Sequence, residues 1–336
     1  MRGLNVNESA GNARGHRGFV DKLARFAGEV GDTRVTVIHN QAAAPLRVAV
    51  HGRPGVGRRT VARALRIAGL HVGEPGEIDV FVVAEVVKPE DRAAIAGSSR
   101  PKIVVLNKAD LCGFGPGGPM AVAADRCARY HRLTGVPTIP MVAHLAAAEL
   151  DDELIAALRL LTTEPADLSS TDAFVDGPHP LPVGVRRRLL ETLDLFGIAV
   201  GVLALRGNAE PNELLRQRSG IDDVIDSLPV AEAGYQRVRA AVTALEALAA
   251  VAETGLAQRV GAFLTADDTV IAQMAAAVDV VEAVGLQVDP GDDSHAHLRR
   301  AVTWQRYARG PVSAAHRACG TDIARGSLRL LGRAGQ

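Results

Sequence analysis

A glycine-rich stretch directly after a short apolar run constrains the fold of this chain more than any other feature. Residues 46–50, LRVAV, hold four apolar side chains and are typical of a buried parallel strand. Gly52, Gly55 and Gly57 follow, and residues 60–68 are expected to form a helix. The backbone N–H groups of such a turn point inward, toward the same spot that the N-terminus of the helix faces, and this arrangement binds anions. The stretch therefore predicts a phosphate-binding loop.

A second apolar run, residues 102–106, ends in Asn107-Lys108-Ala109-Asp110. With this element the chain resembles the P-loop GTPases, in particular Era/TrmE-like G domains, whose N-K-x-D sequence reads guanine. The resemblance implies that Asp110 accepts hydrogen bonds from guanine N1 and N2 and that Asn107 ties neighbouring loops together. It assigns Lys108 to the same guanine site. The implied ligands are GTP or GDP with Mg²⁺.

The resemblance extends to the last strand of the predicted domain, residues 136–143, VPTIPMVA. The family places a Ser-Ala element at the end of this strand, and here Val142-Ala143 stands in its place, so the serine is missing. The backbone N–H of Ala143 is expected to reach guanine O6.

The glycine-rich loop departs from the family pattern at its cation. Gly52 and Gly57 fit G-x-x-x-x-G-K-[ST], but Arg58 and Arg59 occupy the last two positions. The spacing also fits G-x-P-G-x-G-K-x-T of adenylate kinase-like proteins, in which Thr60 would reach Mg²⁺. An arginine fork is too bulky to sit as a lysine does beneath the phosphates, so poor positioning of a γ-phosphate is expected. The implied phosphate-binding residues are Gly52, Gly55, Val56, Gly57, Arg58, Arg59 and Thr60.

The segment after the helix expected at residues 60–68 is too short for the switch regions of a GTPase. Residues 61–77 leave room for the helix and a loop, and no D-x-x-G turn follows. The next apolar run, 78–86, resembles the strand that precedes N-K-x-D in the family. In a competing alignment it is the Walker B strand and Glu85 holds Mg²⁺ through water, although an acidic strand end is also typical of a solvated or helix-capping group. Without switches, little or no hydrolysis is expected.

Composition excludes several classes of protein. At 336 residues and 47% hydrophobic content, about two domains are expected. A net charge of zero argues against nucleic acid as a partner. The three cysteines lack disulfide or metal spacing, which favours the cytoplasm. The longest apolar run, 195–205, is about half the length of a transmembrane helix, so no membrane span is expected.

The predicted fold class is α/β, a reduced P-loop NTPase domain with a mostly parallel sheet followed by an all-α helical bundle. Residues 165–182 are rich in Pro, Ser, Thr and Asp and lack periodicity, which indicates a linker. Helical apolar stripes follow it almost to the end of the chain. The expected parts are an N-terminal tail and helical segment at 1–45, a GTPase-like domain at 46–164, the linker at 165–182 and a helical domain at 183–336.

Charge is polarised within the helical domain. Residues 260–298 carry only acidic charges, whereas residues 299–336 are strongly basic. The two stretches either neutralise each other across a helical hairpin or leave an arginine patch near Trp304 and Tyr307 as a docking surface. A protein partner, or self-association through this domain, is expected.

These features together predict a GTPase-like, guanine-nucleotide-binding protein with weak or no hydrolysis that regulates assembly with a partner. Two alternatives stay open. One is a non-enzymatic scaffold protein that retains a P-loop fold without nucleotide. The other is a kinase-like ATPase, which the Thr60 spacing favours and the N-K-x-D sequence opposes.

Overall fold

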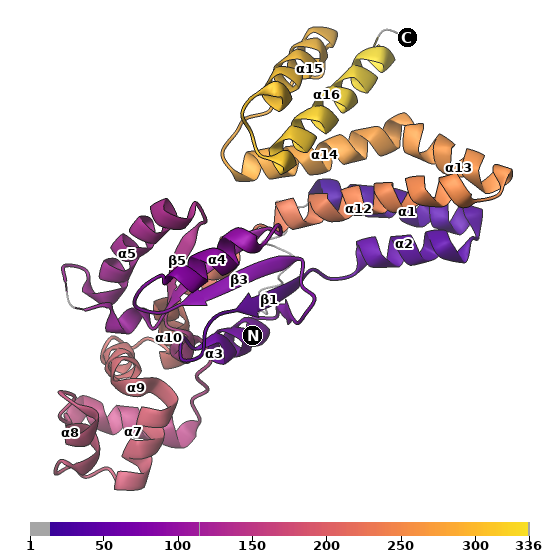
Figure 1. Cartoon of the computed structure of the whole chain (residues 1–336). Coiled ribbons are helices and arrows are strands. Elements are labelled where there is room, and N and C mark those ends of the chain that lie inside the picture. Colours follow the sequence, from indigo (N-terminus) through magenta and orange to yellow (C-terminus); the bar gives the residue numbers. More distant parts are fainter. Residues whose placement is uncertain (1–13, 114, 335–336) are drawn as a thin grey trace. The chain divides into compact units, whose positions relative to one another are not determined.

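The computed structural model describes residues 14–113 and 115–334, which form two compact units. The sheet unit is Arg47–Leu228, and the helical unit combines the chain up to Leu46 with the chain from Pro229 onward (Figure 1). This division differs from the expected parts 1–45, 46–164, 165–182 and 183–336. Residues 183–228 belong to the sheet unit, and the N-terminal helices belong with the C-terminal ones. Most of the expected N-terminal tail lies outside the described residues.

The sheet unit is built on a five-stranded sheet whose strand pairs are all parallel, which confirms the α/β class. The central strand β3 is buried along its whole length, and all of its residues except Asp79 are apolar, as a buried parallel strand requires. Asp79 accepts a hydrogen bond from the Ser98 hydroxyl and pairs with His51. It pairs with β1 on one side and with β4 on the other. In sheet order the strands are β2 (His71–Val72), β1 (Arg47–His51), β3 (Ile78–Val83), β4 (Lys102–Asn107) and β5 (Thr138–Met141).

The chain reverses its direction across the sheet between β1 and β3. From β1 it moves outward to β2, and from β3 it moves the other way through β4 to β5. Right-handed crossovers therefore place the helix after β1 on one face and the helices after β3 and β4 on the other (Figure 1). Ligands of open parallel sheets bind at such a reversal, beyond the carboxyl ends of the strands. The helices are α3 (Arg58–Ile67), α4 (Pro89–Gly97) and α5 (Gly118–Thr134), with a short 3-10 helix at Ala109–Cys112 after β4.

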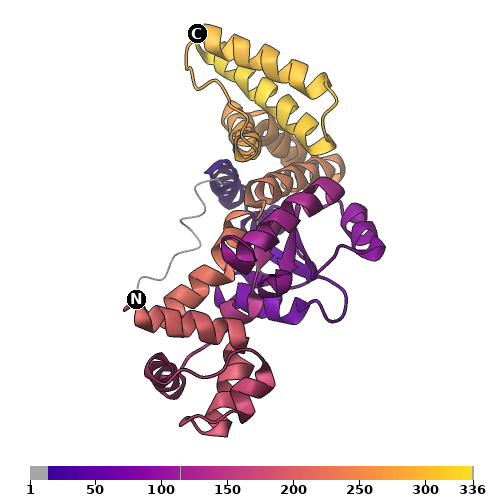
Figure 2. The same ribbon diagram turned by 90° about the vertical axis from the view of Figure 1, so that its left-hand side faces the viewer.

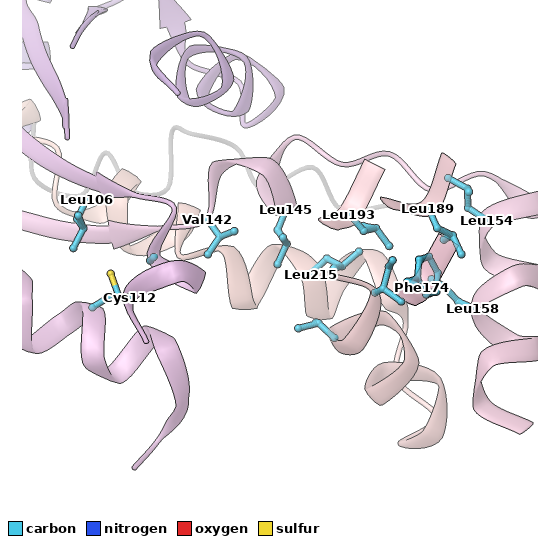
Figure 3. Close-up of a cluster of buried hydrophobic side chains, with 14 of the residues drawn as sticks. Leu106, Cys112, Val142, Leu145, Leu154, Leu158, Phe174, Leu189, Leu193 and Leu215 are labelled. Atoms are coloured by element: carbon cyan, nitrogen blue, oxygen red, sulfur yellow. The ribbon is translucent and has the colours of Figure 1, made fainter. Parts of the chain in front are cut away.

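Six helices follow β5 and pack onto the sheet unit. One buried apolar core runs from Leu106 of the sheet through Leu145 to Phe174 and Leu189 (Figure 3). The predicted linker 165–182 is therefore wrong in part: Ser170 caps a short helix there, and Phe174 is fully buried. The helices are α6 (Ala143–Ala146), α7 (Asp152–Thr163), α8 (Thr171–Asp176), α9 (Val183–Arg206), α10 (Pro211–Ser219) and α11 (Ile221–Asp226).

The helical unit has a core of its own, formed by helices from both ends of the chain. Phe19 and Leu23 of the first helix are fully buried in one cluster with Tyr235, Leu245 and Ile323. The last two helices lie side by side (Figure 2). The helices are α1 (Arg14–Val30), α2 (Thr33–Ala43), α12 (Val230–Val251), α13 (Thr254–Thr265), α14 (Asp267–Ala283), α15 (Ser294–Arg309) and α16 (Ala314–Ala334). Among the described helices, none is long and apolar enough to cross a membrane.

Opposite charges of the helical unit neutralise each other, as the first of the two interpretations predicts. Asp267 and Asp268 at the start of α14 form ion pairs with Arg329 and Arg333 of α16. The predicted arginine patch is smaller than expected because Arg300 is buried and donates to Ser327 Oγ at 2.9 Å. Trp304 is buried as well.

The stability of the helical unit is expected to depend on pH through Asp279. Burial raises the pKa of Asp279 to about 6, although its carboxylate accepts the Gly15 N–H at 2.8 Å. The folded state therefore holds a proton that the unfolded chain, with a pKa near 3.8, releases. This contribution to stability is complete below pH 3.8 and is lost as the pH rises through about 6.

We expect Asp279→Asn to stabilise the helical unit at pH 7 by about 1–3 kcal/mol and to do little at pH 4. The measurement is urea unfolding followed by the fluorescence of Trp304, the single tryptophan, which lies in the helical unit. Asp21→Asn, at an exposed position of α1, is the control and should change stability equally little at both pH values. An equal effect of Asp279→Asn at pH 4 and pH 7 would contradict the prediction.

Candidate functional site

One buried side chain joins the two motifs that the sequence singles out. Asn107, at the end of β4, donates from Nδ2 to the backbone oxygen of Val56 in the glycine-rich loop, at 2.9 Å. Its Oδ1 accepts the backbone N–H of Ala143, which follows β5, at 3.0 Å. Asn107 is 4% exposed. Three segments far apart in sequence are therefore held together at the carboxyl edge of the sheet, beside its point of reversal.

The glycine-rich loop approaches Asn107 too closely for any other residue at position 57. Gly57 has φ 85°, a left-handed conformation, and a Cβ there would lie 2.3 Å from Asn107 Nδ2. Gly52 is similarly confined, because its Cβ would lie 2.8 Å from the Val82 backbone oxygen of β3. The glycines at 52 and 57 are thus required by the packing of the loop against β3 and β4.

A hollow of about 630 Å³ lies over this loop. Helix α3 begins at Arg58, and its N-cap Gly57 has no side chain to bond the first N–H groups of the helix. These N–H groups and the helix dipole favour an anion. We call this hollow the loop hollow. It is lined by Gly52, Arg53, Pro54, Gly55, Gly57, Arg58, Arg59, Thr60 and Lys108.

Cationic side chains dominate the loop hollow. Arg58 and Arg59 are exposed at the first turn of α3, and Lys108 is exposed across from them. Arg53 is held in place by a bidentate ion pair with Asp91. Its Nε lies 2.8 Å from Asp91 Oδ1, and its Nη2 lies 3.0 Å from Asp91 Oδ2. Asp91 is buried at the first turn of α4, so this pair fixes the loop to the neighbouring helix. No sequence motif pointed to Arg53 or Asp91.

The N-K-x-D residues lie at the rim of the same edge. Lys108 takes a left-handed conformation with φ 59°, which turns the chain into the 3-10 helix that holds Asp110. Burial raises the pKa of Asp110, the nearby carboxylate of Asp194 in α9 adds to this effect, and His144 and Lys108 oppose it. Asp110 is therefore a partly buried carboxylate close to residues of α6 and α9.

Ala143 does not offer the free N–H that was expected of it. Its backbone N–H is donated to Asn107. The next N–H, that of His144 in the first turn of α6, makes no hydrogen bond within the described residues. The free donor at the end of β5 is thus one residue later than the sequence pattern suggests.

The two expected magnesium ligands differ in their surroundings. Thr60 is half-buried and lines the loop hollow, where among the described residues it is the one side chain with an oxygen. Glu85 is exposed, follows the end of β3, and is not among the residues that line the hollow. Its backbone has φ 61°, and its backbone oxygen accepts a hydrogen bond from the hydroxyl of Tyr130. The structure therefore places Thr60 in the lining of the loop hollow and leaves Glu85 outside it.

The three cysteines are buried inside the protein. All three are free and buried, and burial raises the pKa of Cys127 and of Cys319 to about 12. A thiol with so high a pKa is a poor nucleophile and a poor metal ligand near neutral pH. Within the described residues, no group of three or more His, Cys, Asp or Glu side chains is placed to hold a metal ion.

The site is thus a hollow between a glycine-rich loop and an N-K-x-D turn, lined by cations and the amino end of a helix. We compared the chain with models of known protein families, with curated proteins and with solved structures, and none of them matches it.

Proposed function

We propose that this chain is a guanine-nucleotide-binding protein of the P-loop GTPase type that hydrolyses GTP weakly or not at all. The nucleotide binds at the carboxyl edge of the sheet. Its phosphates lie in the loop hollow, against the first turn of α3 and the side chains of Arg58, Arg59 and Lys108. Its base lies beside Asp110 and the His144 N–H.

The double hydrogen bond of Asn107 is the observation that carries this proposal. It links the glycine-rich loop to the segment after β5 and brings the Asn107–Asp110 turn to the same place. A purine nucleotide has its phosphates at one end and its base at the other. A protein that binds one therefore needs an anion site and a base-reading group held at a fixed separation, and Asn107 supports that separation through its two contacts.

Asp110 and His144 favour guanine over adenine. Guanine presents two donors, N1–H and the 2-amino group, which match the two oxygens of a carboxylate, and its O6 matches the free His144 N–H. Adenine has an acceptor at N1 and an amino group at position 6, so both contacts are mismatched. A binding site whose polar groups are left unpaired by the wrong ligand discriminates strongly.

Weak hydrolysis is proposed because the loop hollow offers little to a reacting phosphate beyond charge. An arginine stands where a compact lysine would contact the β- and γ-phosphates. Among the described residues that line the hollow there is no carboxylate or amide side chain to orient a water molecule. A Mg²⁺ ion would have Thr60 as its protein ligand and would rely otherwise on phosphate oxygens and water.

Thermal unfolding with separate additions of GDP, GTP and ATP, each with Mg²⁺, tests the proposal. A ligand present at 100 times its Kd adds about 2.7 kcal/mol, which raises the Tm of a unit of this size by roughly 5–10 °C. We expect GDP and GTP to give such a shift and ATP to give none. A shift with ATP alone would favour a kinase-like ATPase, and no shift at millimolar ligand would favour a scaffold without nucleotide.

Exchanging the base-reading carboxylate sharpens this test. Asp110→Asn is expected to weaken GDP binding by about ten- to a hundredfold, because an amide accepts one of the two guanine donors and opposes the other. Xanthosine diphosphate, which has an oxygen in place of the 2-amino group, should bind the variant more tightly than the original chain. Asp125→Asn, at an exposed position of α5, is the control and should leave both affinities unchanged. Equal GDP affinities for the original chain and Asp110→Asn would exclude Asp110 from the base site.

A further inference from the structure

A second hollow adjoins the loop hollow and is not explained by phosphate or base binding. It has a volume of about 520 Å³ and shares Arg59 and Thr60 with the loop hollow. Its other walls come from α6 with the residues after it, and from α9. We call it the side hollow. It is lined by Arg59, Thr60, Arg63, His144, Ala147, Ala148, Glu149, Glu191 and Thr192.

The side hollow lies next to the part of a nucleotide between its phosphates and its base. Thr60 belongs to the proposed phosphate end and His144 to the proposed base end, and both line the side hollow. In a nucleotide the ribose connects these two ends. Arg63 lies three to four residues beyond Thr60 and Arg59 on the same face of α3, so the hollow extends along this helix away from the glycine-rich loop.

Helix α9 is fixed to α6 by buried contacts that place Glu191 and Thr192 in the wall of the side hollow. Leu189 and Leu193 are fully buried in the same cluster as Leu145 of α6 (Figure 3). Gly197 allows the close approach, because a Cβ there would lie 3.3 Å from Leu145 Cδ1. Glu191 lies between the two buried leucines in sequence and is exposed.

The helix is interrupted directly after this segment. Asp194 has φ 58° and ψ 172°, a conformation that residues other than glycine rarely adopt. The interruption ends the first part of α9 within one turn of Glu191. It also places the Asp194 carboxylate close enough to Asp110 to raise the pKa of that group, after the larger effect of burial. The segment Glu191–Asp194 thus lies beside the proposed base end of the site.

The charges of the side hollow suit hydroxyl groups better than another phosphate. Arg63 is paired with Glu149 at 3.4 Å, which leaves less of its charge for a ligand. Glu191 forms no ion pair within the described residues. Its free carboxylate would repel a phosphate, whereas each of its two oxygens accepts a hydrogen bond from a hydroxyl. The vicinal 2′- and 3′-hydroxyls of a ribose present two such donors side by side.

We propose that Glu191 of α9 accepts hydrogen bonds from the ribose hydroxyls of the bound nucleotide and makes the site selective for ribonucleotides over 2′-deoxyribonucleotides. The inference rests on the proposed function and adds to it a contact from helix α9. Glu191 in this role is a binding residue that reads the sugar and takes no part in a chemical step.

Calorimetric titration of the full chain with GDP and with 2′-deoxy-GDP tests this inference. We expect the original chain to bind GDP about tenfold more tightly than 2′-deoxy-GDP, because a hydrogen bond to a charged group is lost with the 2′-hydroxyl. Glu191→Ala removes the contacts to both hydroxyls, so it should weaken GDP binding by about a hundredfold. Binding of 2′-deoxy-GDP, which loses only the 3′-hydroxyl contact, should weaken by about tenfold, so that the ratio of the two affinities falls to about one.

Glu213→Ala provides the matched control, since Glu213 is exposed on α10 of the same unit and lines neither hollow. It should leave both affinities and their ratio unchanged. Circular dichroism melting of Glu191→Ala should coincide with that of the original chain, because Glu191 is exposed. If the original chain binds GDP but does not discriminate, or if Glu191→Ala keeps the original ratio, the inference is overturned while the proposed function stands. If neither GDP nor GTP binds, the proposed function fails and the inference falls with it.

Discussion

Replacing Asn107 by alanine is expected to lower the free energy of unfolding of the sheet unit by about 2–4 kcal/mol. The substitution removes both hydrogen bonds of a side chain that is 4% exposed. It leaves the Val56 oxygen and the Ala143 N–H in a buried place without their partner, and each unpaired buried group costs about 1–3 kcal/mol. Denaturant unfolding followed by circular dichroism measures the loss.

An isosteric variant separates the two hydrogen bonds. Asn107→Asp keeps the shape of the side chain but turns an acceptor toward the Val56 oxygen, so it should destabilise the sheet unit as well. Hydrogen exchange should show faster exchange at Gly52–Thr60 in both variants, because the loop has lost its link to β4. Both variants should also lose GDP binding if the proposed function is correct.

Asn212→Ala is the control for this series. Asn212 is exposed on α10, where its amide bonds the side chain of Glu210, and its loss should change stability by less than about 0.5 kcal/mol. Stability of Asn107→Ala equal to that of Asn212→Ala would show that the two hydrogen bonds do not hold the loop.

Replacing Gly326 by alanine is expected to destabilise the helical unit by about 1–3 kcal/mol, although alanine is the better helix former. A Cβ at position 326 of α16 would lie 2.5 Å from both Cβ and Sδ of Met274 on α14. Rotation of the Met274 side chain moves its sulfur but not its Cβ. The two helices must therefore separate, or their backbones must shift. Urea unfolding monitored by the fluorescence of Trp304 reports on this unit.

The same helix supplies the control. Gly332 of α16 is exposed, and a Cβ there would meet nothing within 4 Å. Gly332→Ala should leave stability unchanged or raise it slightly through helix propensity. If Gly326→Ala behaves like Gly332→Ala, the close packing of α16 on α14 is not what limits residue size at this position.

Local sequence pattern predicted four of the five strands and the turns at their ends, whereas β2 lies within residues 61–77, where a helix and a loop were expected. The runs at 46–50, 78–86 and 102–106 overlap the strands β1, β3 and β4, because a strand buried on both faces needs mostly apolar side chains. The glycines at 52, 55 and 57 marked the turn before α3, since a backbone that doubles back closely leaves no room for side chains.

The same pattern did not show which helices belong together. Residues 183–228 read as part of a C-terminal bundle, but their apolar stripe packs in the core of the sheet unit. Residues 1–45 read as a tail and a separate helical segment, but the helices α1 and α2 within them share a core with helices near the other end of the chain. An amphipathic stripe shows that a helix buries one face and does not identify the partner that covers it.

The residues of the candidate site also fall into those that a local sequence pattern identifies and those that it does not. Asn107, Lys108, Asp110 and the glycines are recognisable because their spacing is local and their chemistry is specific. Arg53 with Asp91, the free N–H of His144, and Glu191 carry no sequence signal, since their roles arise only when segments up to about a hundred and forty residues apart are brought to one edge of the sheet.

By itself, the sequence determined the secondary structure around the sheet, the positions of its two edge turns and the residue types in them, because these depend on neighbours within a few positions along the chain. The tertiary structure alone decided that Asn107 forms hydrogen bonds with both Val56 and Ala143 and that Phe174, in a linker-like stretch, is buried. It also decided that α9 borders the side hollow. Such contacts depend on which apolar faces exclude water together, and that choice is made by the whole chain as it packs.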